Sequence, residues 1–494
     1  MESRKTTFRR PIDDTEDLGT NISFYCDLEY ENLTKDMICH ALSLLRQHHP
    51  YFRLHVETID GRIWLVEEEI GDIPLTWLEN ITESWEDELN SFANQSYDHT
   101  VSLTFLQCRY SIQGRYQIFG VINHIALDGL GFVKALHTLY SYLGEMTLST
   151  NYKTVLPADR RAFINVLERN PIHQPPVFDF THNYLSPQEL DVGLNEIQSI
   201  VPSSQGQMIG LFKKFDPTTT MRLLNHAKTH STTIQGMLST AALITSIWIR
   251  KVRPELPVWT LNWCATNLRQ SAQPPIDSED CISASAPLAW EQEVKEHSLI
   301  WHLAQDASKL LHKHNSRNMG WHFLNAKKFN VPVKPPSIMT SFNGKAQFGT
   351  KYGKLRINDI RIMTAHYNLV PADASSHMNY ISIYDGQMYL VTTYTYPGLS
   401  KEWGKRFHNG IIYILECYAN DSNLTVNSIL DILDKRDRDL HACLNSLLIT
   451  SNPTIFSSLR RLIASVARIF VLPCFMILSS SLLCTVLRRK FFDI

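Results

Sequence analysis

Residues 121–132 read VINHIALDGLGF, and the interpretation of the whole chain depends on this stretch. The apolar residues before His124 are typical of a buried strand, and three apolar residues separate His124 from Asp128 and Gly129. After Gly129, apolar residues recur at intervals of three and four, which is the period of a helix. The stretch therefore predicts the end of a strand, a turn and the start of a helix.

A histidine at a strand end can direct a ring nitrogen into a cleft while the sheet fixes its backbone. Such a histidine can take a proton from an alcohol, amine or thiol that attacks a carbonyl group. Asp128 can brace the turn, and Gly129 allows a backbone conformation or a close approach that a Cβ atom would forbid. The alternative is a hydrogen-bonded histidine at a strand–turn–helix junction with no chemical role. Three residue types alone leave both interpretations open.

The composition sets limits on the architecture and on the partners. The 494 residues are too many for one ordinary hydrophobic core, which predicts two domains or two lobes that share a cleft. A hydrophobic content of 44% and a charged content of 19% are typical of a globular protein. The formal net charge of −2 gives no reason to expect nucleic acid as a partner, so we expect a small molecule instead.

The cysteines and the N-terminal residues bear on the cellular compartment. The nine cysteines form no CxxC pair, and an odd number on a long chain is not a disulfide framework. Cys26, Cys39, Cys108 and Cys417 lie among apolar residues, where a reduced thiol acts as a small hydrophobic side chain. Residues 1–19 are polar and lack the apolar run of a signal peptide. We therefore expect a cytoplasmic protein with reduced cysteines.

The C-terminal residues 448–494 form a predicted hydrophobic tail. Within it, residues 469–487 read IFVLPCFMILSSSLLCTVL and carry no charge, while basic residues flank them on both sides. This length is just sufficient for a helix to span a bilayer. Pro473 and three serines favour the alternative, a buried helix or one that lies on a surface. The tail is therefore a candidate membrane anchor of an otherwise cytoplasmic protein.

The remaining chain falls into two blocks. Residues 1–170 alternate predicted strands and helices, and they include a hairpin that turns at Asp60-Gly61. Residues 171–205 are polar and contain several prolines, so we interpret them as a crossover linker. Residues 206–447 contain a second set of helices and strands. This organisation predicts an α/β fold with mixed or largely antiparallel sheets in two lobes.

The stretch NHIALDG resembles the HHxxxDG motif of a superfamily of CoA-dependent acyltransferases. The superfamily includes chloramphenicol acetyltransferase, condensation domains of peptide synthetases and alcohol acetyltransferases. Further segments resemble it in the same order and cover about residues 10 to 420. These segments are RPIDDTED, ICHALSLLRQHHPYFRL, TTIQGMLSTAALITSI, TNLRQ, the looser match TSFNG, and YDGQMYLVTTYTYPGLSKEWGKRF.

The resemblance implies two chloramphenicol-acetyltransferase-like lobes that form a pseudo-dimer with an active-site tunnel between them. It implies that His124 is the catalytic general base, while Asp128 points away from the substrate and pairs with Arg269 of TNLRQ. Gly129 is implied to be the turn glycine. The implied reaction moves an acyl group from an acyl thioester to an alcohol or amine. Acyl-CoA is the implied co-substrate, with no bound cofactor and no metal.

One residue departs from the motif, because its first histidine is Asn123 in this chain. Successive side chains of a strand face opposite sides of a sheet, so we expect Asn123 to point away from the face that His124 addresses. Two alternatives stay open. One is a condensation-domain-like protein whose acyl donor is bound to a carrier protein, and the other is a catalytically inactive scaffold.

Other sequence features weigh less in the interpretation. No HExxH motif or Cys/His cluster indicates a metal site, and no GxxxxGK[ST] or GxGxxG motif indicates a nucleotide-binding fold. His48 and His49 precede Pro50 at a predicted helix end, where histidine favours the helix dipole. Acyl transfer needs oxyanion donors, and Ser341 and Asn343 of TSFNG are the candidates that the sequence offers.

Overall fold

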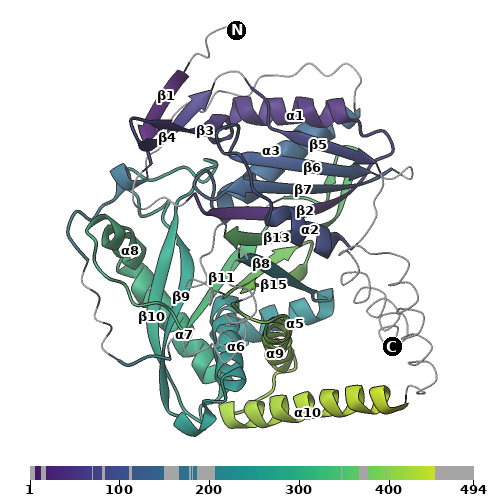
Figure 1. Ribbon diagram of the computed structural model, residues 1–494. Coiled ribbons are helices and arrows are strands. Elements are labelled where there is room, and N and C mark those ends of the chain that lie inside the picture. Colours follow the sequence, from purple (N-terminus) through teal and green to yellow (C-terminus); the bar gives the residue numbers. More distant parts are fainter. Residues whose placement is uncertain are drawn as a thin grey trace, which may run out of the picture. The chain divides into compact units, whose positions relative to one another are not determined.

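The computed structural model describes most of the chain, in stretches separated by gaps (Figure 1). The residues belong to two compact units, 1–430 and 431–494. Beyond residue 450, the predicted hydrophobic tail lies outside the described residues. The described residues are 6–12, 18–68, 71–79, 84–110, 114–148, 166–176, 178, 180, 182–185, 206–346, 348–366, 377–396 and 398–450.

The first of two large sheets is built mainly from the N-terminal part of the chain. Among the described residues its strand order is β12-β13-β2-β7-β6-β5. β2 and β7 are antiparallel, and Asn21 lies opposite Asn123 at the end of the sheet where the motif begins. The strands are β2 (Thr20–Glu29), β5 (Leu75–Glu79), β6 (Thr104–Tyr110), β7 (Arg115–Asn123), β12 (Lys351–Tyr352) and β13 (Leu355–His366).

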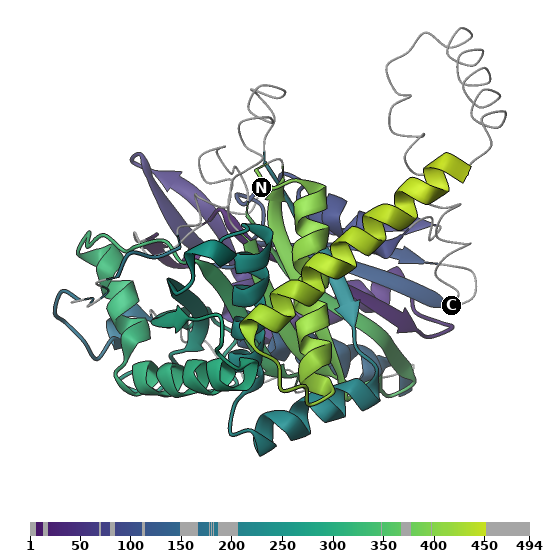
Figure 2. The same ribbon diagram turned by 90° about the horizontal axis from the view of Figure 1, so that it is seen from below.

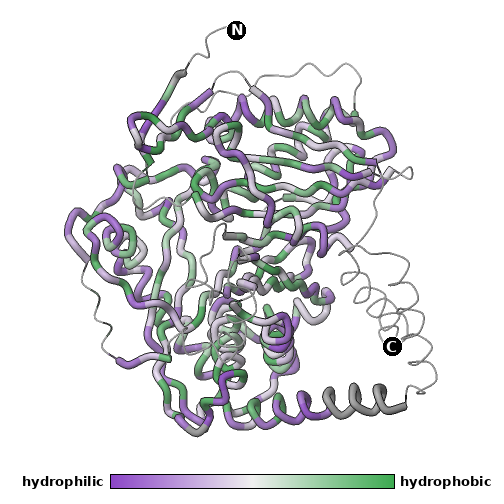
Figure 3. Tube along the Cα trace, in the orientation of Figure 1, coloured by the Kyte–Doolittle hydropathy of each residue, from purple (hydrophilic) through white to green (hydrophobic). Residues whose placement is uncertain are grey.

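Alternation along β2 sends its side chains into two separate cores. Phe24 and Cys26 pack with residues of α1 and α3, whereas Tyr25 packs with α2 and with strands of the second large sheet. Figure 3 shows hydrophilic and hydrophobic residues mixed along α1, as expected for a helix that buries one side. The helices are α1 (Lys35–His48), α2 (Trp85–Ala93) and α3 (Gly129–Leu148).

The second large sheet is built from the C-terminal part of the chain. Among the described residues its order is β10-β9-β11-β14-β15-β8. β11 is parallel to both of its neighbours, and the other pairs are antiparallel, so the sheet is mixed as predicted. The strands are β8 (Gln207–Lys214), β9 (Val258–Asn267), β10 (Ser285–Val294), β11 (Ile338–Lys345), β14 (His377–Tyr384) and β15 (Gln387–Tyr396).

Helix α6 (Ile234–Ile249) is apolar on all sides and almost entirely buried, which is typical of a core helix. Thr233 caps it by accepting a hydrogen bond from a backbone N–H of its first turn. The helix lies beside α9 (Lys401–Ala419), as Figures 1 and 2 show from two directions. A Cβ atom added to Gly410 of α9 would lie 2.6 Å from Thr245 of α6, so glycine is needed for this close approach.

The two large sheets exchange chain. β12 and β13 come from the predicted C-terminal lobe, residues 206–447, yet both belong to the first sheet. β13 pairs with β2 from His366 opposite Thr20 to Arg356 opposite Glu29. The predicted α/β fold with two lobes is confirmed, whereas the sequence boundaries of these lobes stay a prediction.

A smaller sheet completes the N-terminal part, with the order β1-β4-β3 among the described residues. β3 and β4 form the predicted hairpin, and Asp60 and Gly61 have positive φ values of 51° and 74°. Positive φ at both central residues is what a two-residue type I′ turn requires. The strands are β1 (Thr6–Pro11), β3 (Leu54–Ile59) and β4 (Arg62–Glu68).

Helix lengths and hydropathy bear on the membrane question only for the described part of the chain. No single helix there is both long and apolar enough to cross a membrane. α5 (Pro217–Thr229) and α6 reach that threshold only as a pair, and the two are bent by 101° at the break between them. The candidate anchor at residues 469–487 lies outside the described residues, so it stays a prediction.

The environment of the cysteines is partly as predicted. Cys26, Cys108 and Cys417 are buried, but Cys39 is exposed on α1. Its neighbour Ile38 belongs to the buried side of that amphipathic helix, and Cys39 lies on the solvent side. The prediction that Cys39 packs among apolar side chains is therefore wrong.

Candidate active site

His124 immediately follows β7 and is half-buried. Its backbone N–H donates a hydrogen bond to the Thr20 carbonyl oxygen at 2.8 Å, so the end of the first sheet fixes its main chain. Its ring lines a cavity of about 740 Å³ and forms no hydrogen bond or ion pair with any residue that the structure describes. The described surroundings therefore leave the ring nitrogens open to a molecule in that cavity.

Asn123 points away from this cavity, as the strand alternation predicts. Its carboxamide nitrogen donates hydrogen bonds to the Leu18 carbonyl at 2.8 Å and to Asn21 Oδ1 at 3.1 Å. Its carboxamide oxygen accepts a hydrogen bond from the Ile125 N–H at 3.1 Å. Asn123 is fully buried, so it acts on His124 only by holding the turn that carries it.

Asp128 and Arg269 form the predicted ion pair. Arg269 Nη1 lies 2.6 Å from Asp128 Oδ2, and Arg269 Nη2 lies 3.0 Å from Asp128 Oδ1. Only 3% of the Asp128 side chain and 2% of the Arg269 side chain are exposed. This two-bond geometry is the strong form of an arginine–carboxylate contact. The pair joins the motif to the residues that follow β9.

The same carboxylate also organises backbone on both sides of the pair. Asp128 Oδ1 accepts a hydrogen bond from the Gly131 N–H at 2.8 Å, which caps the start of α3. Asp128 Oδ2 accepts one from the Ala284 N–H at 3.0 Å. Arg269 Nη2 in turn donates to the Ile282 carbonyl at 2.8 Å. These hydrogen bonds therefore tie the motif to residues 282–284.

The predicted steric role of Gly129 belongs to another glycine. A Cβ atom on Gly129 would lie 3.6 Å from Asn343 Oδ1, an ordinary contact, and Gly129 does not have a left-handed φ. A Cβ atom on Gly131 would lie only 2.8 Å from the Ile282 carbonyl oxygen. The close approach of residue 282 to the helix therefore depends on Gly131, for which the motif predicts no such role.

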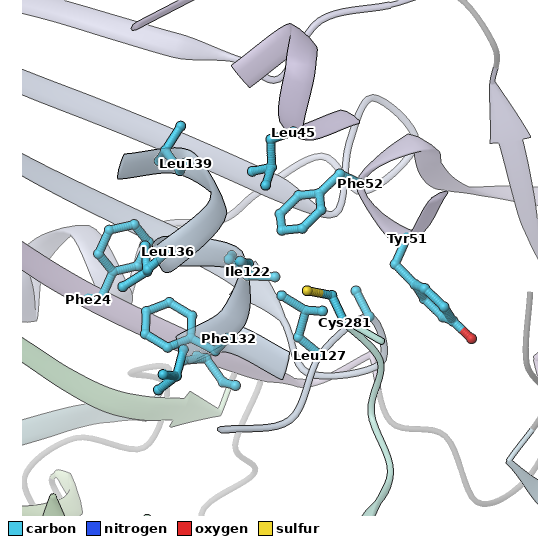
Figure 4. Packing of buried hydrophobic residues seen from close by; sticks show 14 of the residues in the cluster. Phe24, Leu45, Tyr51, Phe52, Ile122, Leu127, Phe132, Leu136, Leu139 and Cys281 are labelled. Atoms are coloured by element: carbon cyan, nitrogen blue, oxygen red, sulfur yellow. The ribbon is translucent and has the colours of Figure 1, made fainter. Parts of the chain in front are cut away.

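A buried thiol lies close to the motif. Cys281 Sγ is 3.5 Å from His49 Nε2, and Figure 4 shows Cys281 among packed apolar side chains that include Leu127 and Phe52. Burial raises the pKa of the Cys281 thiol well above its usual range, Asp128 adds to the rise, and Arg269 opposes it. A protonated, buried thiol is a poor nucleophile. Cys281 therefore has the character of a packing residue.

The cavity that His124 lines is bounded by residues of both predicted lobes. Thr20 and Tyr51 come from the N-terminal part, whereas Ala265 and Ala286 come from β9 and β10. Figure 4 shows Tyr51 extending away from the packed cluster of Phe52 and Leu127. The lining is largely apolar. The Lys, Arg, Asp or Glu side chains on the described lining are Arg10 and Lys327, and both are positive.

The two candidate oxyanion donors contact each other. The Ser341 hydroxyl donates a hydrogen bond to Asn343 Oδ1 at 3.0 Å. Neither residue is among the described residues that line the cavity, although Asn343 lies next to Gly129. Their role in stabilising an oxyanion stays a prediction. The described residues contain no group of three or more His, Cys, Asp or Glu side chains that could hold a metal ion.

Solved structures with the same arrangement cover most of the chain. The condensation domain of the monacolin K polyketide synthase matches with a TM-score of 0.58 and 10% identity, over 85% of this chain and 99% of that one. This chain has the condensation-domain fold. Polyketide synthase associated protein 5 from Mycobacterium tuberculosis shares that fold, with a TM-score of 0.61 and 18% identity over 83% of this chain and 98% of that one.

An acetyltransferase also has the condensation-domain fold. Trichothecene 15-O-acetyltransferase from Fusarium sporotrichioides matches with a TM-score of 0.56 and 11% identity, over 81% of this chain and 92% of that one. No family model and no curated protein sequence matches the chain. The similarity is therefore one of fold.

Several residues of the site were not predicted from the sequence. Thr20 and Tyr51 line the cavity, and so do Phe323 and Leu324 of α8 (Met319–Lys328). β10 and α8 were not expected as elements. The available signal for Tyr51 was its place directly after the segment RQHHP, within a region that resembles the acyltransferases. The apolar lining residues carried no separate signal, because they look like core residues in a sequence.

Proposed function

We propose that the protein is an acyltransferase that moves an acyl group from an acyl thioester to an alcohol or amine, with His124 as the general base. The observation that carries the proposal is the placement of His124 at a cavity, with its main chain fixed by a sheet and its ring without a partner among the described residues. A condensation domain and an acetyltransferase share the fold, which supports acyl transfer in general terms.

In the proposed reaction, a ring nitrogen of His124 accepts the proton of the acceptor hydroxyl or amine. The acceptor oxygen or nitrogen forms a bond to the thioester carbonyl carbon, and the carbonyl π electrons move to its oxygen. When the tetrahedral intermediate collapses, the carbon–sulfur bond breaks and the departing thiolate takes the proton from the His124 imidazolium. General base catalysis of this kind contributes about 10²- to 10⁴-fold.

The neighbouring residues fit a direct transfer. Asp128 is fully engaged by Arg269 and by two backbone N–H groups, so it orients the turn and does not contact the reacting atoms. The buried, protonated Cys281 thiol does not offer a nucleophile for an acyl-enzyme. A direct transfer needs neither a metal nor a covalent intermediate.

The charge of the cavity supports an anionic donor. Arg10 and Lys327 are positive, and the described lining contains no carboxylate. Positive charge near a substrate route favours a phosphate-bearing thioester, because opposite charges raise its local concentration. Coenzyme A and the phosphopantetheine arm of a carrier protein both have this chemistry, and CoA is the donor that needs no second protein.

The test of the proposed function is the release of free thiol from acyl-CoAs, each offered with a pool of alcohols and amines. Wild-type protein should release thiol only when both substrates are present, and His124→Ala should lose at least 100-fold of that rate. His302→Ala is the matched control, because His302 is exposed on α7 (Ile300–Ser316) and should retain the wild-type rate. Equal rates for His124→Ala and wild type would show that His124 is not the base.

A carrier-bound donor is the second candidate, and the condensation-domain fold favours it. It predicts no thiol release from acyl-CoA but transfer from an acyl group loaded on a phosphopantetheinylated carrier protein. The same three proteins can be assayed with that donor. If His124→Ala and wild type are equally inert with both donors, the remaining alternative is a binding or scaffold protein.

A further inference from the structure

The cavity at His124 extends from the motif along strands β9 and β10 of the second large sheet. Near the motif it is lined by Ser283 and Ser285, which flank Ala284, the residue whose N–H binds Asp128. Ser285 of β10 pairs with Asn267 of β9. The cavity lining continues along β9 to Trp263, four residues farther on. At the usual rise per strand residue this is a depth of roughly 13 Å.

Trp263 and Phe323 form an aromatic wall at the far end. Their ring centroids lie 5.3 Å apart with an interplanar angle of 74°, an edge-to-face contact, and both residues line the cavity. Phe178 packs behind them at 4.8 Å from Phe323. Phe180 stacks on Phe178 at 5.6 Å. Phe178 and Phe180 therefore extend the aromatic cluster that begins with Trp263 and Phe323.

The crossover segment is fastened to this wall. Asn325 of α8 is buried, and its carboxamide nitrogen donates hydrogen bonds to the carbonyls of Ile172 at 2.9 Å and Gln174 at 3.1 Å. Its carboxamide oxygen accepts a hydrogen bond from Asn170 at 2.7 Å. These bonds hold the chain that carries Phe178 against α8. The aromatic wall is thus a fixed end of the cavity.

Beyond Ser283 and Ser285, the walls between His124 and the aromatic end are mostly apolar. Ala265 lies midway along β9, two residues from Trp263, so both side chains face the same side of the strand. Met339 of β11 and two residues of the loop between α8 and β11, Val331 and Val333, line the same space. An extended occupant with many polar groups would find few partners along this path. An extended apolar chain would bury its surface there.

We propose that this cavity binds an extended apolar chain of the substrate, with the reacting group at His124 and the chain end against Trp263 and Phe323. This inference rests on the proposed function only in that it calls the bound molecule a substrate, because binding itself requires no turnover. The chain belongs either to the acyl group of the thioester donor or to the acceptor alcohol. The aromatic wall sets the longest chain that fits, so Trp263 and Ala265 determine the length specificity.

The experiment measures equilibrium binding of two probe series, so that it does not depend on catalysis. The first series is n-alkyl-CoA thioethers, which cannot transfer their chain, and the second is n-alkanols of the same lengths. For the series that enters the cavity, the Kd of wild-type protein should fall about fourfold per added methylene. The fall should stop when the chain reaches the aromatic wall.

Two variants and one control locate the chain. Ala265 is exposed to the cavity, so Ala265→Phe should place a ring across its middle without disturbing the core. The Kd should then stop falling several carbons earlier than in wild type. Ala265→Ser, the matched control, should follow wild type at every length. Trp263→Ala should let the fall continue to longer chains than in wild type.

Each outcome of the experiment has a defined meaning. If only the thioethers respond to Ala265→Phe, the chain is the acyl chain of the donor, and if only the alkanols respond, it is part of the acceptor. A folded Ala265→Phe protein that tracks wild type at all lengths in both series overturns the proposal. Length-dependent binding by wild-type protein that transfers no acyl group from either acyl-CoA or a loaded carrier protein would instead overturn the proposed function alone.

Discussion

Asp128 and His124 lie four residues apart in one turn, yet their environments are opposite. The Asp128 carboxylate is buried, pairs with both terminal nitrogens of Arg269 and accepts hydrogen bonds from two backbone N–H groups. The His124 ring is half-buried and has no hydrogen-bond partner among the described residues. The Asp128 carboxylate therefore has its hydrogen-bond partners within the protein, whereas the nitrogens of the His124 ring are available to a ligand.

Within a single motif, the surroundings of Asp128 indicate a role in stability, and those of His124 indicate a role in the proposed reaction. The loss of one partner of a buried ion pair leaves an uncompensated buried charge and destabilises the fold. An unpartnered ring at a cavity contributes little to folding, and its removal should be felt in the reaction. Substitutions at the buried pair should therefore lower stability, and substitution of His124 should slow the proposed reaction.

Arg269→Ala should lower the free energy of unfolding by about 3–5 kcal/mol, because the Asp128 charge would stay buried without its partner. Activity should fall with the folded population. Chemical denaturation of Arg269→Ala and of Arg269→Lys measures the effect. The lysine variant keeps the charge but not the two-bond geometry, so it should be intermediate. If the unfolding curve of Arg269→Ala superimposes on that of wild type, the Asp128–Arg269 pair has no structural role.

His408 shows what full burial does to a histidine. It lies on α9, its Nδ1 is 2.9 Å from Thr392 Oγ1, and burial lowers its pKa from 6.5 to about 4, with a smaller effect from Lys213. The folded state therefore resists protonation. This contribution to stability is complete above about pH 6.5 and is lost as the pH falls toward 4.

Wild-type protein should thus lose about 3 kcal/mol relative to His408→Gln between pH 7 and pH 4. The difference between the two proteins isolates His408, because the other histidines titrate in both. Urea denaturation at a series of pH values measures it. If the stability difference is constant over this range, His408 does not titrate with a lowered pKa.

Gly131 and Gly129 form a matched pair in the same turn. Gly131→Ala should destabilise by about 1–3 kcal/mol, because its Cβ would press on the Ile282 backbone at 2.8 Å. Gly129→Ala should be neutral or stabilising by up to about 1 kcal/mol, since its Cβ would meet only an ordinary contact and alanine favours the helix. Thermal unfolding of both variants decides this. A larger loss of stability for Gly129→Ala than for Gly131→Ala would show that Gly129 is the sterically required glycine.

The sequence predicted the parts of this site that depend on local pattern. The strand end, the turn, the helix after Gly129 and the direction of Asn123 follow from periodicity and strand alternation. The partner of Asp128 followed from the resemblance of TNLRQ, because the two residues are 141 positions apart and no local rule connects them. The predicted close packing at Gly129 failed because the crowded backbone comes from residue 282, which the motif does not contain.

The rest of the fold depends on long-range pairing, which a local pattern does not reveal. β13 reads as an ordinary strand of the second block, yet it pairs with β2 in the first sheet. The cavity wall also depends on contacts between residues that are far apart in the sequence. Trp263 and Phe323 look like core residues in the sequence, and only the arrangement of β9, α8 and the crossover segment leaves space beside them.

The central claim is tested most directly by single-turnover acyl transfer by His124→Ala, with the free energy of unfolding measured on the same preparation. The account predicts a rate about 10²- to 10⁴-fold below wild type and a free energy of unfolding within about 0.5 kcal/mol of wild type. A rate within a few-fold of wild type, from a protein of unchanged stability, would contradict the assignment of His124 as the base.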